Sequence, residues 1–287
     1  MRRSRIALLL AVALLPLAGC RRSHAGSGAG PPSPNGPEVA RLRGVMETVR
    51  PLYHPLGPAV PGDWRFFSPE EGQTFSQYLA SNPNVPDGKR RFLYVRPLGD
   101  LTPAQLRIVQ LTAEYLERFY ELPARIAPAL PLGAMPAWAH FRVVTTERIQ
   151  TGYLMDRLKR VLPDDAFAEI GLTAADLYPN DRLSLVFGQA SLRDRVGVWS
   201  LHWLGEPDQS EAEFRTTLAR TLKIASHETG HMFSIPHCTK YLCVMNGTGS
   251  LNEVDRHPLD ACPECMAKIC WATGYDPRRR FERIAEF

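Results

Sequence analysis

The segment His227-Glu228-Thr229-Gly230-His231, followed six residues later by His237, is the most informative stretch of this sequence. On a helix, histidines four residues apart lie on successive turns of one face, so both imidazoles can reach one metal ion. Glu228 then lies beside that metal, where a carboxylate can act as a general base. His237 follows the expected end of the helix, where the chain can fold back to supply a third nitrogen. Three protein ligands leave the fourth position of a tetrahedral zinc open to water, as a catalytic site requires.

The residues before this motif predict the helix that carries it. Ser210 and Glu213 have the spacing of a capping box. Apolar residues recur at helical spacing and form one stripe: Phe214, Leu218, Leu222, Ala225 and Met232. At about 100° per residue, His227 and His231 project from the opposite side, so one face can be buried while the other borders a cleft. Histidines at this spacing also occur on ordinary solvated helices, but this context favours a metal site.

Paired cysteines follow the histidines. They are Cys238, Cys243, Cys262 and Cys265. Their number and spacing are typical of a tetrahedral thiolate zinc site. Two disulfides are the alternative, which an oxidising compartment would favour. Cys270 is expected to be a buried core thiol.

Together, HExxH, His237-Cys238, Met245 and the cysteine pairs resemble the archaemetzincins, a branch of the metzincin zinc peptidases. That family carries HExxHxxGxxHC, a Met-containing turn and four cysteines that hold a second, structural zinc. Upstream segments resemble strands of its core: Arg91–Gly99, Leu177-Tyr178, Leu185–Ala190 and Val196–Leu201. Two further segments are similar to the amino-terminal extension of longer members: Pro61–Trp64 and Gly72–Phe75.

The resemblance implies a role for each motif residue. The ligands of a catalytic zinc would be His227, His231 and His237. Glu228 would activate a zinc-bound water that hydrolyses a peptide bond, and Met245 would lie beneath the metal as a hydrophobic floor. The ligands of a structural zinc would be Cys238, Cys243, Cys262 and Cys265.

The chain departs from the family pattern at Ser234, where the family has glycine. That glycine lets the chain leave the helix with a positive φ, and a non-glycine residue there costs on the order of 1 kcal/mol or more. The position of His237 therefore depends on how zinc and packing hold this turn.

Strand and helix patterns alternate before the motif, which predicts a mixed α/β (α+β) domain. A helix is expected from Thr102-Pro103 to about Leu122, with buried positions at Leu106, Val109, Ala113, Leu116 and Tyr120. The other expected elements are a strand at Phe141–Thr145, a helix at Gln150–Leu162, and paired strands at Asp181–Ala190 and Val196–Trp203.

The resemblance narrows this fold to a metzincin-like zincin. It implies a mixed twisted sheet, an active-site helix and a small zinc-stabilised C-terminal subdomain. In metzincins an edge strand pairs with the extended substrate, and Leu183–Ala190 or Val196–Leu201 could serve here.

The first nineteen residues are typical of an export signal, with three early arginines and an apolar run at Ile6–Leu15. Leu17-Ala18-Gly19-Cys20 resembles the lipobox of bacterial lipoproteins, so lipidation at Cys20 is expected; an ordinary secretory signal is the alternative. Residues 20–37 would then form a flexible tether, and residues 38–287 the peptidase domain, with an N-terminal extension over about 38–89. This organisation predicts an extracytoplasmic, lipid-anchored protein of the bacterial cell envelope, facing the periplasm or at the cell surface.

Charge argues against one class of partner. Without the signal and its three arginines, the 34 basic residues fall to 31 against 30 acidic residues. A nearly neutral chain without a basic stripe is not expected to bind nucleic acid. We expect a monomer that acts on a peptide or protein substrate.

The sequence therefore predicts a membrane-anchored, zinc-dependent metallopeptidase with two zinc ions. The alternative is a non-catalytic zinc-binding lipoprotein that holds peptides or a partner protein in the same cleft. Glu228 favours the enzyme, because metal binding alone does not require it. Structural roles are expected for the lone His140 and His202, for Glu264 as an exposed acid at a turn, and for the five tryptophans as packing residues.

Overall fold

A computed structural model describes residues 33, 35–179 and 185–287. Strands and helices alternate along this part of the chain, which confirms the mixed α/β class. Among the described residues, no helix combines the length and apolar character needed to span a membrane. The signal segment, Cys20 and nearly all of the tether lie outside the described residues.

The main sheet has five strands in the order β2-β1-β5-β8-β7. The bounds are β1 (Phe92–Leu98), β2 (Ala124–Ile126), β5 (Ala166–Thr173), β7 (Gly188–Ala190) and β8 (Val196–Ser200). The first four in sheet order run parallel, and β7 pairs antiparallel with β8 at the edge. A smaller sheet has the order β3-β4-β6. Its strands are β3 (His140–Val143), β4 (Thr146–Gln150) and β6 (Asp176–Tyr178).

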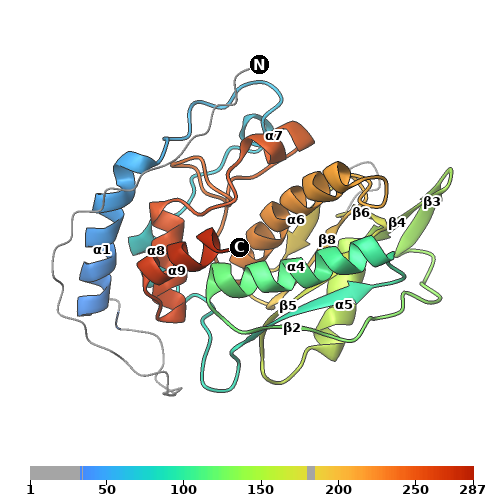
Figure 1. Cartoon of the computed structure of the whole chain (residues 1–287), viewed down its shortest axis with the longest axis horizontal. Coiled ribbons are helices and arrows are strands. Elements are labelled where there is room, and N and C mark those ends of the chain that lie inside the picture. The colour runs from blue at the N-terminus through green and yellow to red at the C-terminus, as the bar shows by residue number, and fades with distance from the viewer. Residues whose placement is uncertain (1–32, 34, 180–184) are drawn as a thin grey trace.

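Helices cover both faces of the main sheet (Figure 1). Helices α4 and α6 lie side by side on one face, and α5 lies on the other. Their bounds are α4 (Pro103–Tyr120), α5 (Thr151–Val161) and α6 (Glu211–Met232). The other helices are α1 (Pro37–Val49), the 3₁₀ helix η1 (Arg50–Leu52), α2 (Trp64–Phe67), α3 (Phe75–Ala80), α7 (Leu251–Arg256), α8 (Pro263–Thr273) and α9 (Pro277–Ala285).

Helix α6 carries the histidine motif and follows the predicted pattern. The Ser210 hydroxyl accepts a hydrogen bond from the Glu213 N–H at 3.1 Å, which is the serine half of the predicted capping box. The apolar stripe is buried except for Leu218, which is partly buried, and α6 packs on α4, β5 and β8. This packing fixes the helix so that its histidine face is turned away from the core.

The central strand β5 is not predicted by the sequence pattern. All eight of its residues are buried, because helices cover both faces of the sheet at this point. A parallel strand buried on both faces does not alternate between apolar and polar residues. A side chain at Gly171 would place its Cβ 2.6 Å from a Leu98 methyl group, so glycine permits the close packing of β5.

Several predicted boundaries differ from the observed ones. The predicted strand Asp181–Ala190 is observed only as β7, and residues 180–184 lie outside the described residues. The predicted strand Val196–Trp203 ends at Ser200. The prediction that Leu106 is buried was wrong, since it is 42% exposed at the start of α4.

The segment predicted to be an N-terminal extension, about residues 38–89, packs against the C-terminal helices. Helices α1 and α3 contact α8, and α1, α8 and α9 stand together in Figure 1. The interpretation of Glu264 as an exposed turn acid was wrong. Its carboxylate accepts the Phe75 N–H at 2.7 Å and pairs with Lys240 at 2.5 Å. Glu264 therefore joins Phe75 of this segment to Lys240, which lies in the loop after α6.

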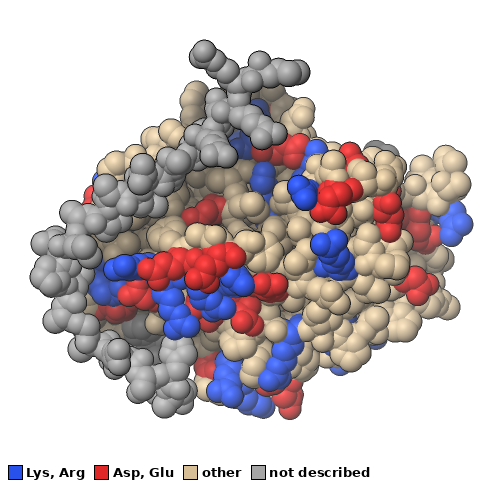
Figure 2. Space-filling model, viewed as in Figure 1, with Lys and Arg blue, Asp and Glu red and all other residues tan. Residues whose placement is uncertain are grey.

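Ion pairs hold α9 against the end of α4. Arg283 pairs with Glu121 at 2.8 Å and with Glu117 at 3.4 Å. Figure 2 shows basic and acidic side chains intermixed on the viewed face, most densely where α9 lies in Figure 1. These ion pairs hold the C-terminal end of the chain against α4, which packs beside α6.

Candidate metal centre

His227, His231 and His237 converge at one end of a cleft. One nitrogen from each lies within 4.8 Å of the others, and the Nε2 atoms of His227 and His231 are 3.0 Å apart. Two nitrogens that each bind a tetrahedral zinc at 2.0–2.1 Å lie about 3.3 Å apart. The three imidazoles therefore fit one zinc ion.

Each imidazole is held through its Nδ1 atom. The acceptors are the Val244 carbonyl for His227 at 2.9 Å, the Ile235 carbonyl for His231 at 2.8 Å, and the Glu70 carboxylate for His237 at 2.7 Å. A hydrogen bond from Nδ1–H leaves the unprotonated Nε2 as the metal donor. Burial lowers the pKa of His231 to about 4 and also holds that of His227 well below its usual range, so both rings are neutral.

Glu228 lies beside these histidines and is 5% exposed. Burial raises the pKa of its carboxyl group to about 8. The Oε2 atom has no hydrogen-bond partner in the described part of the chain. A Cβ at Gly188 would lie 2.7 Å from Glu228 Oε1, so a glycine in the edge strand leaves room for this carboxylate.

The chain leaves α6 through a left-handed turn at Ser234, whose φ is 62°. The Ser234 N–H bonds to the His231 carbonyl at 2.8 Å and the Ile235 N–H to the Gly230 carbonyl at 3.2 Å, as in a Schellman motif. Serine thus adopts the conformation for which the family uses glycine, and His237 still reaches the other two histidines.

The Ser234 side chain makes two hydrogen bonds that glycine could not make. Its hydroxyl accepts the Asn84 N–H at 3.0 Å and donates to the Leu192 carbonyl at 2.9 Å. Asn84 also donates to the carbonyls of Leu192 and Met232. These bonds join the end of α6 to the extension and to the β7–β8 turn, and they offset the strain of the turn.

Met245 is fully buried under the motif. A Cβ at Gly230 would lie 2.4 Å from the Met245 sulfur, so glycine inside the motif allows this contact. The methionine therefore packs against α6 at Gly230, next to His231 in the chain.

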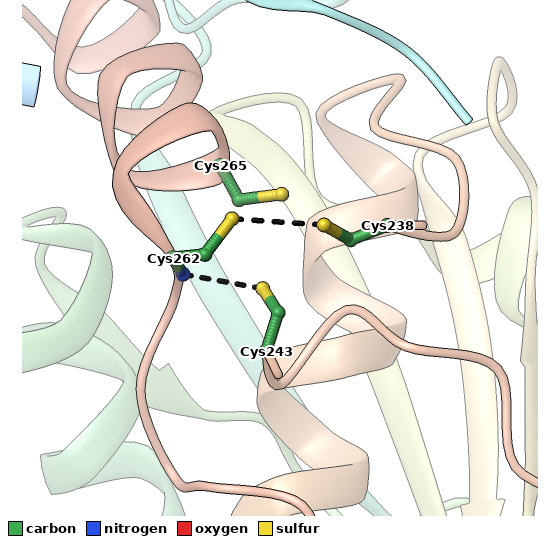
Figure 3. A group of neighbouring side chains, drawn as sticks. All are labelled: Cys238, Cys243, Cys262 and Cys265. Atoms are coloured by element: carbon green, nitrogen blue, oxygen red, sulfur yellow. Dashed lines mark hydrogen bonds between the residues drawn. The ribbon is translucent and has the colours of Figure 1, made fainter. Parts of the chain in front are cut away.

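The four predicted cysteine sulfurs form a single buried group (Figure 3). They all lie within 4.8 Å of one another, with Cys238 Sγ and Cys262 Sγ 3.6 Å apart. Sulfurs that bind one tetrahedral zinc at 2.3 Å lie about 3.8 Å apart. Cys262 and Cys265 occupy the start of α8, where the helix dipole stabilises thiolates. All five described cysteines are free, and Cys270 is buried as predicted.

The cysteine group favours a bound cation on electrostatic grounds. Hydrogen bonds with the other three thiols of the group lower the pKa of Cys238, whereas hydrogen bonds with its own three neighbours, Cys238 first among them, raise the pKa of Cys265. Several thiolates can ionise together at this distance only if a positive charge compensates them.

A cleft of about 340 Å³ opens over the three histidines and Glu228. The edge strand β7 forms one wall, whereas β8 is paired on both sides. Of the two segments expected to pair with substrate, only the one that contains β7 lies at the edge of the described sheet. Leu183 lies outside the described residues. Trp64 forms part of another wall.

Sequence reasoning missed Trp64, Glu70, Asn84 and Gly188 as residues of this site. Three of them come from the extension, and Glu70 is far from His237 in sequence. The available signal was that Trp64 belongs to one of the two segments that resemble the extension of longer archaemetzincins, and that Glu70 lies between them.

Comparison with known proteins agrees with this geometry. The family model described as Peptidase family M54 matches residues 140–270. Archaemetzincin-2 of Macaca fascicularis is 31% identical over 285 residues, covering 87% of this chain and 78% of that protein. The chain belongs to the archaemetzincin family. It is accordingly a zinc-dependent metallopeptidase, as the sequence predicted.

Other archaemetzincins show the same relationship. Human archaemetzincin-2 is 29% identical over 288 residues, covering 88% of this chain and 79% of that protein. The crystal structure of an archaemetzincin from Methanopyrus kandleri aligns with a TM-score of 0.52 and 27% identity. It matches 69% of this chain and 99% of its own, so the rest of this chain has no counterpart there.

The Ser234 turn allows a stability test. Ser234→Ala keeps the left-handed strain and loses both hydroxyl bonds, so it should lower the free energy of unfolding by about 1–3 kcal/mol. Ser234→Gly loses the same bonds but relieves about 1 kcal/mol of strain, so its loss should be smaller. Chemical denaturation of zinc-loaded protein measures both values. A glycine variant less stable than the alanine variant would contradict this account.

Proposed function

We propose that this archaemetzincin hydrolyses peptide bonds with His227, His231 and His237 as ligands of a catalytic zinc and Glu228 as the proton carrier. One observation carries the proposal. Three imidazoles, each held through Nδ1, converge beside a buried carboxylate in a cleft with an edge strand as one wall.

The residues present supply the steps of hydrolysis. A zinc ion held by these neutral imidazoles would supply an acidified water and would polarise a substrate carbonyl. Glu228 would take a proton from this water as the water oxygen attacks the carbonyl carbon, and would return it to the peptide nitrogen as the C–N bond breaks. Burial brings the pKa of Glu228 towards neutrality, where a carboxyl group can both accept and release a proton.

The edge strand suggests how substrate is held. An extended peptide or protein segment can add through main-chain hydrogen bonds to the edge of β7, the outermost strand of the described sheet. Gly188 and Ala190 present little side chain at this edge, and both line the cleft. We propose that a single chain, without a partner copy, forms this site.

Removing the Glu228 carboxylate tests the catalytic role. Glu228→Ala should lower kcat/KM by about 10²–10⁴-fold at unchanged zinc content, because general acid–base catalysis contributes that much. Cleavage of a peptide library with product mapping measures it, with Glu71→Ala as an exposed control. Equal inactivity of the wild type and Glu228→Ala at matched zinc content would instead support the non-catalytic zinc-binding lipoprotein.

We further propose that Cys238, Cys243, Cys262 and Cys265 bind a second, structural zinc. The mutual closeness of the four sulfurs supports one tetrahedral site over two disulfides. This site would stabilise the loop that contains Met245, since Cys238 N–H donates to the Met245 carbonyl at 2.7 Å.

Metal analysis separates the two possibilities for these cysteines. The wild type should contain two zinc ions per chain, and Cys262→Ser should contain one and unfold at a lower temperature, because a structural zinc contributes folding free energy. Cys270→Ser, which removes a thiol outside the group, should keep both ions. One zinc per wild-type chain together with two mapped disulfides would refute the structural site.

We also propose that the chain is a lipoprotein of the bacterial cell envelope, anchored at Cys20. The lipobox-like Leu17-Ala18-Gly19-Cys20 and the preceding apolar run support this proposal. The Gly-, Ser- and Pro-rich residues up to 37 would separate the peptidase from the membrane by roughly 20 Å on random-coil scaling.

Fractionation of bacteria that express the full chain tests the anchor. The wild type should sediment with membranes and be released by detergent, while Cys20→Ser should lose the lipid and no longer be held there. Cys270→Ser should still sediment. Equal membrane association of the wild type and Cys20→Ser would show that lipid on Cys20 is not the anchor.

A further inference from the structure

His237 differs from the other two histidines in what holds it. The Nδ1 atoms of His227 and His231 bond to backbone carbonyls of the segment that follows α6. The Nδ1 atom of His237 bonds instead to the Glu70 carboxylate, at 2.7 Å and 2.9 Å from its two oxygens. One orienting group of the metal centre thus comes from the N-terminal extension.

Glu70 is itself fixed by Trp64. The Trp64 indole N–H donates to Glu70 at 3.3 Å, and the indole ring meets the His237 ring edge-on. Trp64 is anchored by its backbone N–H, which donates at 2.8 Å to the buried Glu253 carboxylate. Its ring lies so close to Gly247 that a Cβ there would be 2.2 Å from it. Contacts therefore run from the loop beyond Met245 through Trp64 and Glu70 to His237.

We propose that Glu70 is a positioning residue of the catalytic metal centre, which makes the extension a working part of that centre. A carboxylate that accepts Nδ1–H fixes the ring orientation and raises the basicity of the ligating nitrogen. His237 lies beyond the end of α6 and is partly exposed, so the helix does not hold its ring as it holds those of His227 and His231. This inference rests on the proposed role of His237 as the third zinc ligand.

Zinc affinity tests the role without relying on catalysis. The zinc bound by the three histidines of the full-length protein is titrated against a competing chelator. The proteins compared are the wild type, Glu70→Ala, Glu70→Gln and Glu71→Ala. Loss of such an orienting partner typically weakens metal binding about 10–100-fold, which we expect for Glu70→Ala. Glu70→Gln keeps an oxygen acceptor, so its zinc affinity should lie between those of Glu70→Ala and the wild type. Glu71→Ala removes a neighbouring exposed acid and should bind zinc as the wild type does.

A double-mutant cycle with His237→Ala shows whether Glu70 acts through the histidine. Glu70→Ala should add no more than about twofold to the weakening already caused by His237→Ala, since its partner is then absent. Unfolding of the zinc-free proteins should be unchanged by Glu70→Ala, which separates positioning from general stability. Wild-type affinity in Glu70→Ala, or equal weakening with and without His237, would overturn the inference. Wild-type zinc affinity in His237→Ala would also contradict the proposal that His237 is the third zinc ligand.

Discussion

The left-handed turn at Ser234 decides where every metal-binding side chain beyond α6 can lie. It ends the helix just after His231 and reverses the chain, so that His237 returns to the face that carries His227. Glycine would adopt this conformation without strain. Serine adopts it and gains hydrogen bonds to Asn84 and to the β7–β8 turn, so the residue that departs from the family pattern also ties three segments together at the site.

One loop after this turn serves both metal-binding groups. His237 is adjacent to Cys238, and Cys243 is adjacent to Val244, whose carbonyl orients His227. A cation bound by the cysteines would therefore fix the loop that positions two of the three histidines. The extension holds the same loop from outside, through the contacts of its tryptophan and glutamate. The catalytic geometry thus depends on segments that enclose the end of α6 from both sides.

Sequence alone predicted the parts of this architecture that rest on local patterns. The 3.6-residue period located α4 and α6, and the spacing of the motif brought the three histidines together. The central strand Ala166–Thr173 was missed because burial on both faces removes the alternation that signals a strand. Glu70 was missed for a different reason. Its partner His237 lies 167 residues away, and no local pattern encodes a contact over that separation.

We expect the reversed chain and the extension together to complete a three-histidine zinc site. A crystal structure of the zinc-loaded protein, with anomalous diffraction collected at the zinc absorption edge, tests this claim most directly. We predict that one of two zinc peaks is bound to Nε2 of His227, His231 and His237, with the Glu70 carboxylate on the Nδ1 of His237, and that the other lies at the cysteine group. A zinc bound by only His227 and His231, or one that takes Glu70 in place of His237, would contradict it.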